Sequence, residues 1–376
     1  MLSLYTHIPF CVKKCLYCGF YSTPYTLQNA DVYINALRIE AAGMAANFSD
    51  RQFGSLYFGG GTPTALPAHQ LTSVISIVRS HFTLALDAEV TVEANPQSGT
   101  EHLFEVLLKS GVNRLSIGVQ SLSDRLLATL GRPHSAAEAE HAARSARRCG
   151  FKNIGIDLIY GIPGQTKGDW ERTLERALML GPDHVSAYSL SLDEGSSYQQ
   201  QTASGSMQMP DDDAVAELYD VGVERLAAAG FIHYEISNFA QPGFECRHNL
   251  NYWHRGEYLG LGPGAWSFIA GRRSRSVPDL TTYNTGLYNG SPVFTEDETP
   301  GPAAAALETV MLGLRTRRGI ELKRIANEFG PQVRDHLVAQ SAPMIDKGLL
   351  RIDAGRLFLT DRGMVLSNEV LGRLSL

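Results

Sequence analysis

Short apolar runs alternate with longer amphipathic segments through the first half of the chain. The apolar runs predict strands over Ser3–His7, Ser55–Phe58, Glu89–Glu93, Arg114–Gly118, Asn153–Ile159 and His184–Leu190. The amphipathic segments predict helices over Asp31–Ala46, Ala68–His81, Glu101–Ser110, Ala136–Cys149 and Gly168–Leu180. Because repeated strand–helix units build a parallel sheet with helices outside it, six such units would make a partial barrel. Functional sites on such sheets gather at the C-terminal ends of the strands.

After residue 192 the alternation stops. The Ser-, Gln- and Gly-rich stretch Asp193–Pro210 is typical of a long connection, and Asp211–Ala229 predicts an amphipathic helix. Asp211 or Asp212 is a suitable N-cap for this helix, and Gly230 stands just after its end. We expect this part of the chain to extend the barrel.

The last part of the chain, from Pro300, predicts a small separate unit. It is expected to contain helices over Ala303–Leu314, Leu322–Phe329 and Val333–Lys347 and a hairpin over Leu349–Leu359. This order is typical of a winged-helix-like unit, for which we expect a structural or substrate-covering role because no strong basic face accompanies it. The expected architecture is α/β, with a partial (β/α)6 barrel over 1–192, an extension over 193–299 and a winged-helix-like domain over 300–376.

The composition is that of a globular protein. The 376 residues are 44% hydrophobic and 19% charged, as in ordinary globular proteins, and the formal charge of −6 gives no overall attraction to nucleic acids. No apolar run is long enough to span a membrane, and the N-terminus does not resemble a signal peptide. Five cysteines, an odd number, favour a reducing compartment, so we expect a cytoplasmic protein.

One local basic patch stands out, Arg272-Arg273-Ser274-Arg275. A solvated loop is its first interpretation, and peripheral contact with a membrane surface or an anionic ligand is the alternative. The sequence leaves both membrane contact and a homodimer open.

Three cysteines lie within eight residues near the N-terminus, with the spacing C-x3-C-x2-C, at Cys11, Cys15 and Cys18. Three thiolates this close together cannot all pair as disulfides, but they can share one metal centre. On a four-iron cluster they would leave one iron free for a small chelating ligand. The alternatives are free core thiols or a zinc site, for which His7 is the obvious fourth ligand.

Polar residues or glycines follow several of the predicted strands. Gly59-Gly60-Gly61-Thr62 after the second strand lets backbone groups approach a ligand closely, although a tight turn is the commoner use of such a run. Glu93, Gln120 and Asp157 stand at or near the ends of later strands, and Arg132 is a charged fork suited to a carboxylate. Because Asp157 lies in an apolar run, we expect it to have a partner, for which Arg132 is one candidate.

A second cluster reads His248-Asn249-Leu250-Asn251-Tyr252-Trp253. A histidine beside aromatic residues is either a hydrogen-bonded core residue or an axial haem ligand with rings packed on the macrocycle. The residues alone favour the core interpretation.

Taken together, these motifs resemble the coproporphyrinogen-oxidase-like branch of the radical S-adenosylmethionine (SAM) superfamily. The resemblance spans nearly the whole chain and implies a partial (β/α)6 barrel with a small C-terminal domain. It implies a 4Fe-4S cluster on the three cysteines, with SAM chelating the fourth iron. By this resemblance, the positions expected to contact SAM are Tyr5, Gly60, Gly61, Thr62, Glu93, Gln120, Arg132 and Asp157.

Two members of the branch differ at positions that this chain displays. The oxygen-independent coproporphyrinogen III oxidase resembles it but has a fourth cysteine where this chain has Phe20, and an N-terminal arm that the ten residues before Cys11 do not supply. The haem chaperones of the branch combine C-x3-C-x2-C-x-F with His-Asn-x-x-Tyr-Trp, and this chain matches both, although they more often carry Asp where Gly19 stands.

The resemblance therefore implies a carrier that binds haem through His248 and transfers it to apo-haemoproteins such as respiratory enzymes. The oxidase is the alternative, and a haem-degrading methyltransferase is a more distant one. Whether SAM is cleaved, and hence whether the protein is an enzyme, is not decided by the sequence.

Overall fold

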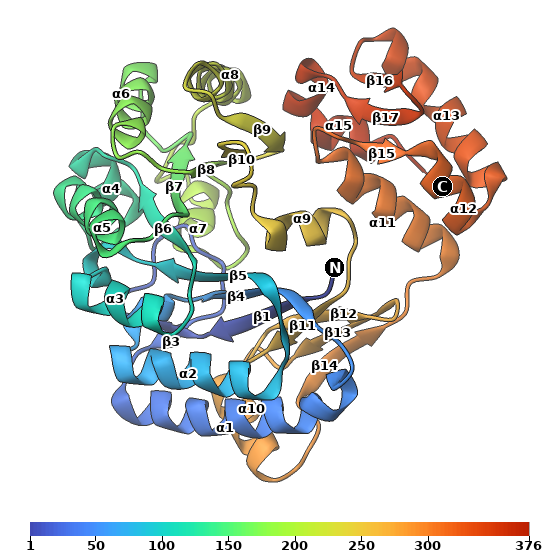
Figure 1. Ribbon diagram of the computed structural model, residues 1–376. Coiled ribbons are helices and arrows are strands. Elements are labelled where there is room, and N and C mark those ends of the chain that lie inside the picture. Colours follow the sequence, from blue (N-terminus) through green and yellow to red (C-terminus); the bar gives the residue numbers. More distant parts are fainter. Residues whose placement is uncertain (376) are drawn as a thin grey trace.

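Figure 1 shows a computed structural model of the chain, which describes residues 1–375. Its main sheet has twelve strands in the order β14-β13-β12-β11-β1-β4-β5-β6-β7-β8-β10-β9. The six predicted strands lie side by side and parallel at its centre as β1 (Ser3–Ile8), β4 (Phe53–Gly60), β5 (Leu84–Ala94), β6 (Arg114–Gln120), β7 (Ile154–Tyr160) and β8 (His184–Ser189). The predicted α/β partial barrel is confirmed.

Helices cover the outer face of this sheet (Figure 1). The five predicted ones are α1 (Leu27–Ala45), α2 (Ala68–His81), α3 (Glu101–Lys109), α5 (Ala136–Cys149) and α6 (Lys167–Leu178), and a short helix, α4 (Asp124–Leu130), was not expected. Local chemistry sets their ends. The α5 helix begins at Ser135, whose side chain forms a reciprocal capping box with Glu138, and it ends at Gly150 in the left-handed region.

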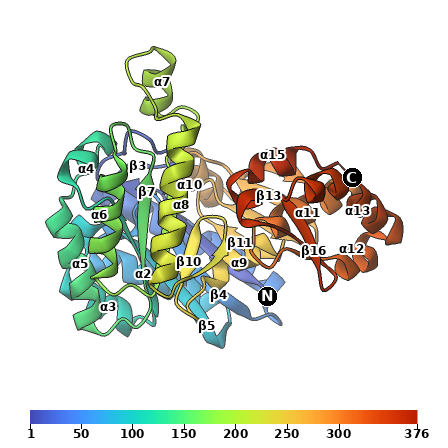
Figure 2. The same ribbon diagram turned by 90° about the horizontal axis from the view of Figure 1, so that it is seen from above.

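Residues from the second part of the chain complete both edges of the sheet. Beyond β8 lie the antiparallel strands β10 (Asn238–Ala240) and β9 (Ile232–Glu235). Beyond β1 lie β11 (Tyr258–Leu261), which is parallel to it, and then antiparallel β12 (Trp266–Ile269), β13 (Arg272–Ser276) and β14 (Phe294–Glu298). The expected connection over 193–210 contains a short helix, α7 (Ser197–Ala203), which projects from the body in Figure 2.

Three further helices belong to this part of the chain. The predicted helix is present as α8 (Asp212–Ala228), with Asp211 as its N-cap. The α10 helix (Leu280–Tyr288) packs against α1. The third, α9 (Arg247–Trp253), packs on β4, where the ring of His248 lies 4.9 Å from that of Tyr57. Because Leu56 and Phe58 belong to the main core while Tyr57 faces α9, this helix lies on the face of the sheet opposite the outer helices.

The basic patch of the sequence is a strand and not a loop, so the loop interpretation was wrong. Its three arginines lie on β13 and form ion pairs across the strand boundary with acidic residues of β14, as Arg272–Asp297, Arg273–Glu298 and Arg275–Glu296. These acids lie more than twenty residues downstream, so only strand pairing brings the opposite charges together. The pairing offsets the positive charge that suggested an anionic partner.

The C-terminal residues have a hydrophobic core of their own. They form α11 (Pro302–Leu314), β15 (Ile320–Glu321), α12 (Leu322–Phe329), α13 (Pro331–Asp346), β16 (Leu350–Asp353), β17 (Arg356–Leu359), α14 (Asp361–Val365) and α15 (Ser367–Gly372). Val310, Leu337 and Leu357 are fully buried in that core, which is separate from the core under the main sheet. In Figure 2 the elements of this part, drawn in red and orange, lie to one side of the main sheet. Backbone bonds from Ile236 N to Arg315 O (3.0 Å) and from Arg317 N to Tyr234 O (3.1 Å) join this part to the β9–β10 turn.

None of the helices in residues 1–375 is both long and apolar enough to cross a membrane.

Candidate metal and cofactor site

The three clustered cysteines lie in the loop that follows β1. Cys11 ends the short strand β2 (Phe10–Cys11), which pairs with β3 (Thr23–Pro24), and Cys15 and Cys18 lie in the loop between these two strands. All three are half-buried free thiols. Burial raises the pKa of the Cys18 thiol, and nearby Cys15 and Cys11 raise it further. The loop therefore gathers three accessible thiols at the C-terminal end of β1.

The three thiols do not converge as the ligands of a single zinc ion would. Within residues 1–375, no three His, Cys, Asp or Glu side chains converge on a point where they could hold one metal ion. In an iron–sulfur cluster each cysteine binds a different iron, so the thiols need not converge on one atom. His7, the fourth ligand of the zinc alternative, is engaged elsewhere, since its Nε2 lies 3.0 Å from Tyr21 O and its Nδ1 3.1 Å from the Tyr5 hydroxyl.

Arg132 joins the cysteine loop to the end of β6. Its Nη1 donates to Cys15 Sγ at 3.3 Å and its Nη2 to the Gly118 carbonyl at 2.9 Å, while its buried Nε has no protein partner. The contact places a positively charged group beside one of the three clustered thiols. In this structure the predicted carboxylate-binding arginine therefore touches a predicted cluster ligand.

The glycine run follows β4 and packs directly on the start of the cysteine loop. Gly61 N donates to Ile8 O at 2.9 Å and Thr62 N to Phe10 O at 2.7 Å. A Cβ atom on Gly61 would lie 2.6 Å from the Phe10 carbonyl oxygen, and Gly60 adopts a φ of 112°. Thr62 also places its hydroxyl 3.6 Å from Cys11 Sγ. Both glycines are required for this close approach.

Glu93 lies beside the same glycines, near the end of β5. Its carboxylate accepts a hydrogen bond from the Tyr57 hydroxyl at 2.9 Å. Burial first, and then the charge of Asp157, raise the pKa of Glu93 to about 7. The ring of Tyr5 stacks near Tyr57, with 6.3 Å between ring centroids. The half-buried carboxyl of Glu93 and the rings of Tyr5 and Tyr57 thus lie next to the glycine run.

Gln120, the last residue of β6, has a φ of 64°. This left-handed conformation is uncommon for a residue other than glycine and is often found at functional sites. Its side-chain amide lies over Gly118, where an added Cβ would be 2.9 Å from Nε2 and 3.3 Å from an Arg132 nitrogen. The bend of the backbone therefore places the Gln120 amide next to Arg132.

The candidate pairing of Asp157 with Arg132 was wrong. Asp157 on β7 accepts instead from the hydroxyl of Ser116 on β6, at 3.0 and 3.1 Å to its two oxygens. Burial raises the pKa of Asp157, and the Ser186 and Ser116 hydrogen bonds oppose that rise. Ser116 lies on the neighbouring strand β6, where it is paired with Gly155 of β7. Its contact with Asp157 therefore depends on how the two strands pair, which the local sequence does not indicate.

His248, the predicted haem ligand, is 1% exposed. Its Nδ1 lies 2.9 Å from the Ser55 hydroxyl and its Nε2 2.9 Å from the Tyr252 hydroxyl, so both ring nitrogens are hydrogen-bonded. Burial lowers the pKa of His248 to about 3, with the charge of Arg114 contributing. In this conformation His248 has the environment of a core histidine.

The helix that carries His248 is held by a residue that the sequence did not single out. Glu89, a buried residue of β5, accepts from the backbone N–H groups of His248 and Arg247, each at 3.1 Å. The contacts cap the first turn of α9 with a carboxylate. A buried glutamate on a strand was a visible signal, but its partner lies more than 150 residues away.

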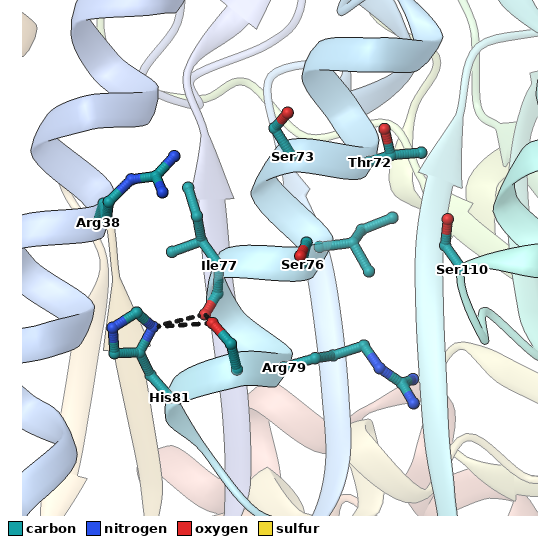
Figure 3. Close-up of a pocket in the computed structure, with 10 residues that line it drawn as sticks. Arg38, Thr72, Ser73, Ser76, Ile77, Arg79, His81 and Ser110 are labelled. Carbon is teal, nitrogen blue, oxygen red and sulfur yellow. Dashed lines mark hydrogen bonds between the residues drawn. The ribbon is translucent and has the colours of Figure 1, made fainter.

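A surface hollow elsewhere does not contribute to this site. It lies on the outer side of α1 and α2 and is lined by Arg38, Arg79, His81 and several hydroxyl side chains (Figure 3). Thr72 and Ser73 donate to His69 O, and Ser80 donates to Ile77 O, so these hydroxyl hydrogens are used by the helix itself. The hollow offers two arginines and no gathered catalytic group.

Two protein-family models and several known proteins match this chain. The radical SAM superfamily model matches residues 5–177, and the HemN C-terminal domain model matches residues 302–366. The heme chaperone HemW of Mycobacterium tuberculosis (strain ATCC 25618 / H37Rv) is 39% identical over 371 residues, which cover 98% of this chain and 93% of that protein. The chain belongs to the HemW family. The HemW of Bacillus subtilis (strain 168) is 34% identical over 373 residues, covering 99% of this chain and 98% of that protein.

A solved relative supports the fold assignment of this HemW-family chain. The coproporphyrinogen III oxidase HemN from Escherichia coli, described as a radical SAM enzyme, superposes with a TM-score of 0.87 at 25% identity. The match covers 99% of this chain and 89% of the oxidase chain. The C-terminal residues of this HemW-family member are thus of the HemN C-terminal type.

Proposed function

We propose that this HemW-family chain is a haem chaperone that carries a 4Fe-4S cluster and SAM, binds haem, and transfers it to apo-haemoproteins such as respiratory enzymes. The observation that carries the proposal is the gathering of three free thiols beside the glycine run and Arg132, in a chain that matches heme chaperones along nearly its full length. Cys11, Cys15 and Cys18 would hold the cluster.

The SAM site is proposed on the strand ends next to these thiols. Its residues are Tyr5, Gly60, Gly61, Thr62, Glu93, Gln120, Arg132 and Asp157. Close backbone approach at Gly60 and Gly61, the carboxyl of Glu93 and the amide of Gln120 supply donors and acceptors for a polar ligand of this size. The chemistry that a reduced cluster would supply is one-electron reduction of SAM.

Haem binding through His248 also stays a proposal. A histidine ligand would hold the iron on one side and leave its other side open to a recipient protein. In the structure the Tyr252 hydroxyl occupies Nε2, so ligation requires that this hydrogen bond opens and that His248 becomes exposed. We propose that ligand binding shifts the chain toward such an open state.

The test is a haem titration of anaerobically reconstituted protein, followed at the Soret band. A saturable one-to-one band, weakened at least tenfold in His248→Ala, is expected. Cys149→Ser serves as the matched control, because Cys149 is a half-buried thiol of α5 outside the cysteine loop. Absence of saturable binding to the wild-type protein would contradict the chaperone.

The alternative function is the oxygen-independent oxidation of coproporphyrinogen III by radical SAM chemistry. The similarity to the HemN structure over 99% of the chain favours it. It would be tested by incubating the reconstituted protein with coproporphyrinogen III, SAM and a reductant. Formation of decarboxylated porphyrinogen would replace the carrier with an enzyme.

The proposal extends to the organisation and location of the protein. We propose the division into residues 1–192, 193–299 and 300–376, in which residues 300–376 have a separate core. A cytoplasmic location fits the five free thiols in residues 1–375. The proposed partners are haem and its recipients, without nucleic acid.

A further inference from the structure

The end of the helix that carries His248 is fixed by a carboxylate of the C-terminal residues. Glu308 of α11 accepts a hydrogen bond at 2.7 Å from Nε of Arg255, the second residue after α9, and it also forms an ion pair with Arg273 of β13. The side chains of Arg255, Glu308 and Arg273 are only 13%, 23% and 24% exposed. Water and salt screen such partly buried charges less than exposed ones. We call these interactions the Glu308 contact.

The backbone of Arg255 has an unusual conformation. Its φ of 53° lies in the left-handed region, which residues other than glycine seldom adopt. Its N–H donates to the carbonyl of Tyr252 at 2.9 Å and so closes the last turn of α9, at a position that glycine commonly occupies. Because a strained backbone persists only where its surroundings hold it, the contact with Glu308 is the interaction that offsets this conformation.

The two arginines of the Glu308 contact lie against one aromatic ring. The guanidinium carbons of Arg255 and Arg273 are 4.6 and 5.7 Å from the centroid of the Phe268 ring on β12. Phe268 is 4% exposed, so this ring is fixed by the protein around it. The Glu308 contact thus has a rigid base as well as a charged centre.

A continuous row of packed rings leads from this base to His248. The ring centroids are 6.3 Å apart between Phe268 and Tyr258 and 4.6 Å apart between Tyr258 and Tyr252. The last pair of centroids, those of Tyr252 and His248, is 4.9 Å apart. The hydroxyl of Tyr252 is the group that lies 2.9 Å from Nε2 of His248. A displacement at Glu308 therefore reaches His248 through neighbours in direct contact.

The two ends of α9 are held by different parts of the chain. Glu89 of the main sheet accepts the N–H groups of the first turn, whereas the last turn is tied to the C-terminal residues through the Glu308 contact. Arg324 of α12 adds a hydrogen bond from Nη2 to the His254 carbonyl at 3.2 Å. Because the C-terminal residues have a core of their own, the contacts at the last turn can open without unfolding either core.

We propose that Glu308 is a positioning residue, which keeps Tyr252 on Nε2 of His248 as long as both arginines hold it, and which frees His248 for iron when these contacts open. The inference rests on the proposed haem-carrier function with His248 as the ligand. Opening breaks charge-assisted contacts, so the closed state dominates and haem selects the open one. The apparent affinity for haem then depends on a carboxylate outside the haem ligand itself.

The first experiment measures hydrogen exchange of the α9 amides by mass spectrometry in cluster-loaded, haem-free protein. Glu308→Gln removes the carboxylate charge and should raise the exchange rate of α9 about tenfold, the effect expected from the loss of charge-assisted hydrogen bonds. Glu369→Gln is the matched control, because it breaks an exposed pair with Arg373 on α15 and should change this rate by at most about twofold. Iron and sulfide content and circular dichroism verify that each variant is folded.

A second variant separates the Glu308 contact from the stability of the helix end. Arg255→Gly removes the guanidinium but gives the left-handed position its preferred residue, which by itself would slow the exchange of α9. Faster exchange in this variant would therefore support the role of Glu308. Unchanged or slower exchange of α9 in Arg255→Gly or in Glu308→Gln would overturn it.

Haem titration at the Soret band tests the link to His248. Glu308→Gln should bind haem about tenfold more tightly than the wild type, because a larger share of the molecules is open. A residue with only a structural role would leave the affinity unchanged or weaken it. In the background of Tyr252→Phe, which removes the hydroxyl from Nε2, Glu308→Gln should have a smaller effect, because the group through which it acts is absent.

The outcomes distinguish this inference from the function on which it rests. Unchanged or weaker haem binding in Glu308→Gln, or an equal effect with and without the Tyr252 hydroxyl, would overturn the positioning role while haem binding itself persists. No saturable binding of haem to the wild type would instead overturn the proposed function.

Discussion

The guanidinium of Arg132 contacts the thiol of Cys15, with 3.3 Å between Nη1 and Sγ, while its second nitrogen is fixed on the Gly118 carbonyl at 2.9 Å. The arginine thus links a loop of the cysteine motif to the end of β6, more than a hundred residues later. This contact orients the cysteine loop and places a positive charge beside one of its thiols.

Arg132→Gln is therefore expected to weaken retention of the cluster. Charge-assisted hydrogen bonds contribute about 1.5–3 kcal/mol, which corresponds to roughly a tenfold or greater loss of affinity. Iron and acid-labile sulfide per chain, measured after anaerobic reconstitution and gel filtration against a chelator, would report the loss. Arg125→Gln is the control, because Arg125 forms an exposed ion pair with Asp169 on the outer helices. Equal retention in both variants would contradict a role for Arg132 at the cluster.

The individual cysteines give a second prediction. Replacing Cys11, Cys15 or Cys18 by Ser should each reduce bound iron to a small fraction of the wild-type amount, because a hydroxyl is a poor substitute for a thiolate ligand. Cys149→Ser should retain full iron content, since that thiol lies on α5 against the Glu101 carbonyl. If only one of the three changes reduced iron, the shared centre would be disproved.

Gly61 provides a stability prediction with an internal control. A Cβ at Gly61 would lie 2.6 Å from the Phe10 carbonyl oxygen, a backbone atom that cannot move without displacing the cysteine loop. Gly61→Ala should lower the free energy of unfolding by about 1–3 kcal/mol, the usual cost of overpacking. Gly43→Ala, in the last turn of α1 with nothing within 4 Å of the added Cβ, should be neutral or stabilise by up to about 1 kcal/mol. The free energies of unfolding would be measured in urea for both variants in their cluster-free form. Equal changes in the two variants would contradict the prediction.

The central fold could be predicted because its information is local. Parallel strands buried on both faces appear as short apolar runs, and the longer helices between them carry caps such as Ser135 and Thr166. The seven-residue helix α4 is too short for a periodic signal. The edge strands β9 to β14 were not recognised as such, because they are short, and β10 and β11 join the sheet only by pairing with the distant strands β8 and β1.

The sequence could predict which residues form the site but not which residues they contact. The motif placed the cysteines, Gly61 and Glu93 at strand ends, where the structure has them. It gave Asp157 the wrong partner, because Ser116 faces it only through the register between β6 and β7. The burial of His248 likewise depends on α9 lying against Ser55 and Glu89 of two other strands.

Buried neutral histidines lead to the last prediction, which concerns pH. Burial lowers the pKa of His248 to about 3 and that of His7 to about 4, from about 6.5 in the unfolded chain. Between these values the unfolded chain binds more protons, so the stability that these rings contribute is complete above about pH 6.5 and is lost as the pH falls. At pH 5 the loss for His248 is about 2 kcal/mol.

Urea unfolding of the cluster-free protein at pH 7.5 and pH 5 would show this, with His248→Gln as the test. The variant should be less stable at pH 7.5, because it loses the contacts with Ser55 and Tyr252, but its stability should fall less between the two pH values. Glu93 and Glu40, whose pKa burial raises to about 7, act in the opposite direction in both proteins and cancel in the comparison. His102→Gln, an exposed change on α3, should keep the wild-type pH dependence. An identical slope for His248→Gln and the wild type would mean that His248 is hydrated in solution, and so already open to a ligand such as haem.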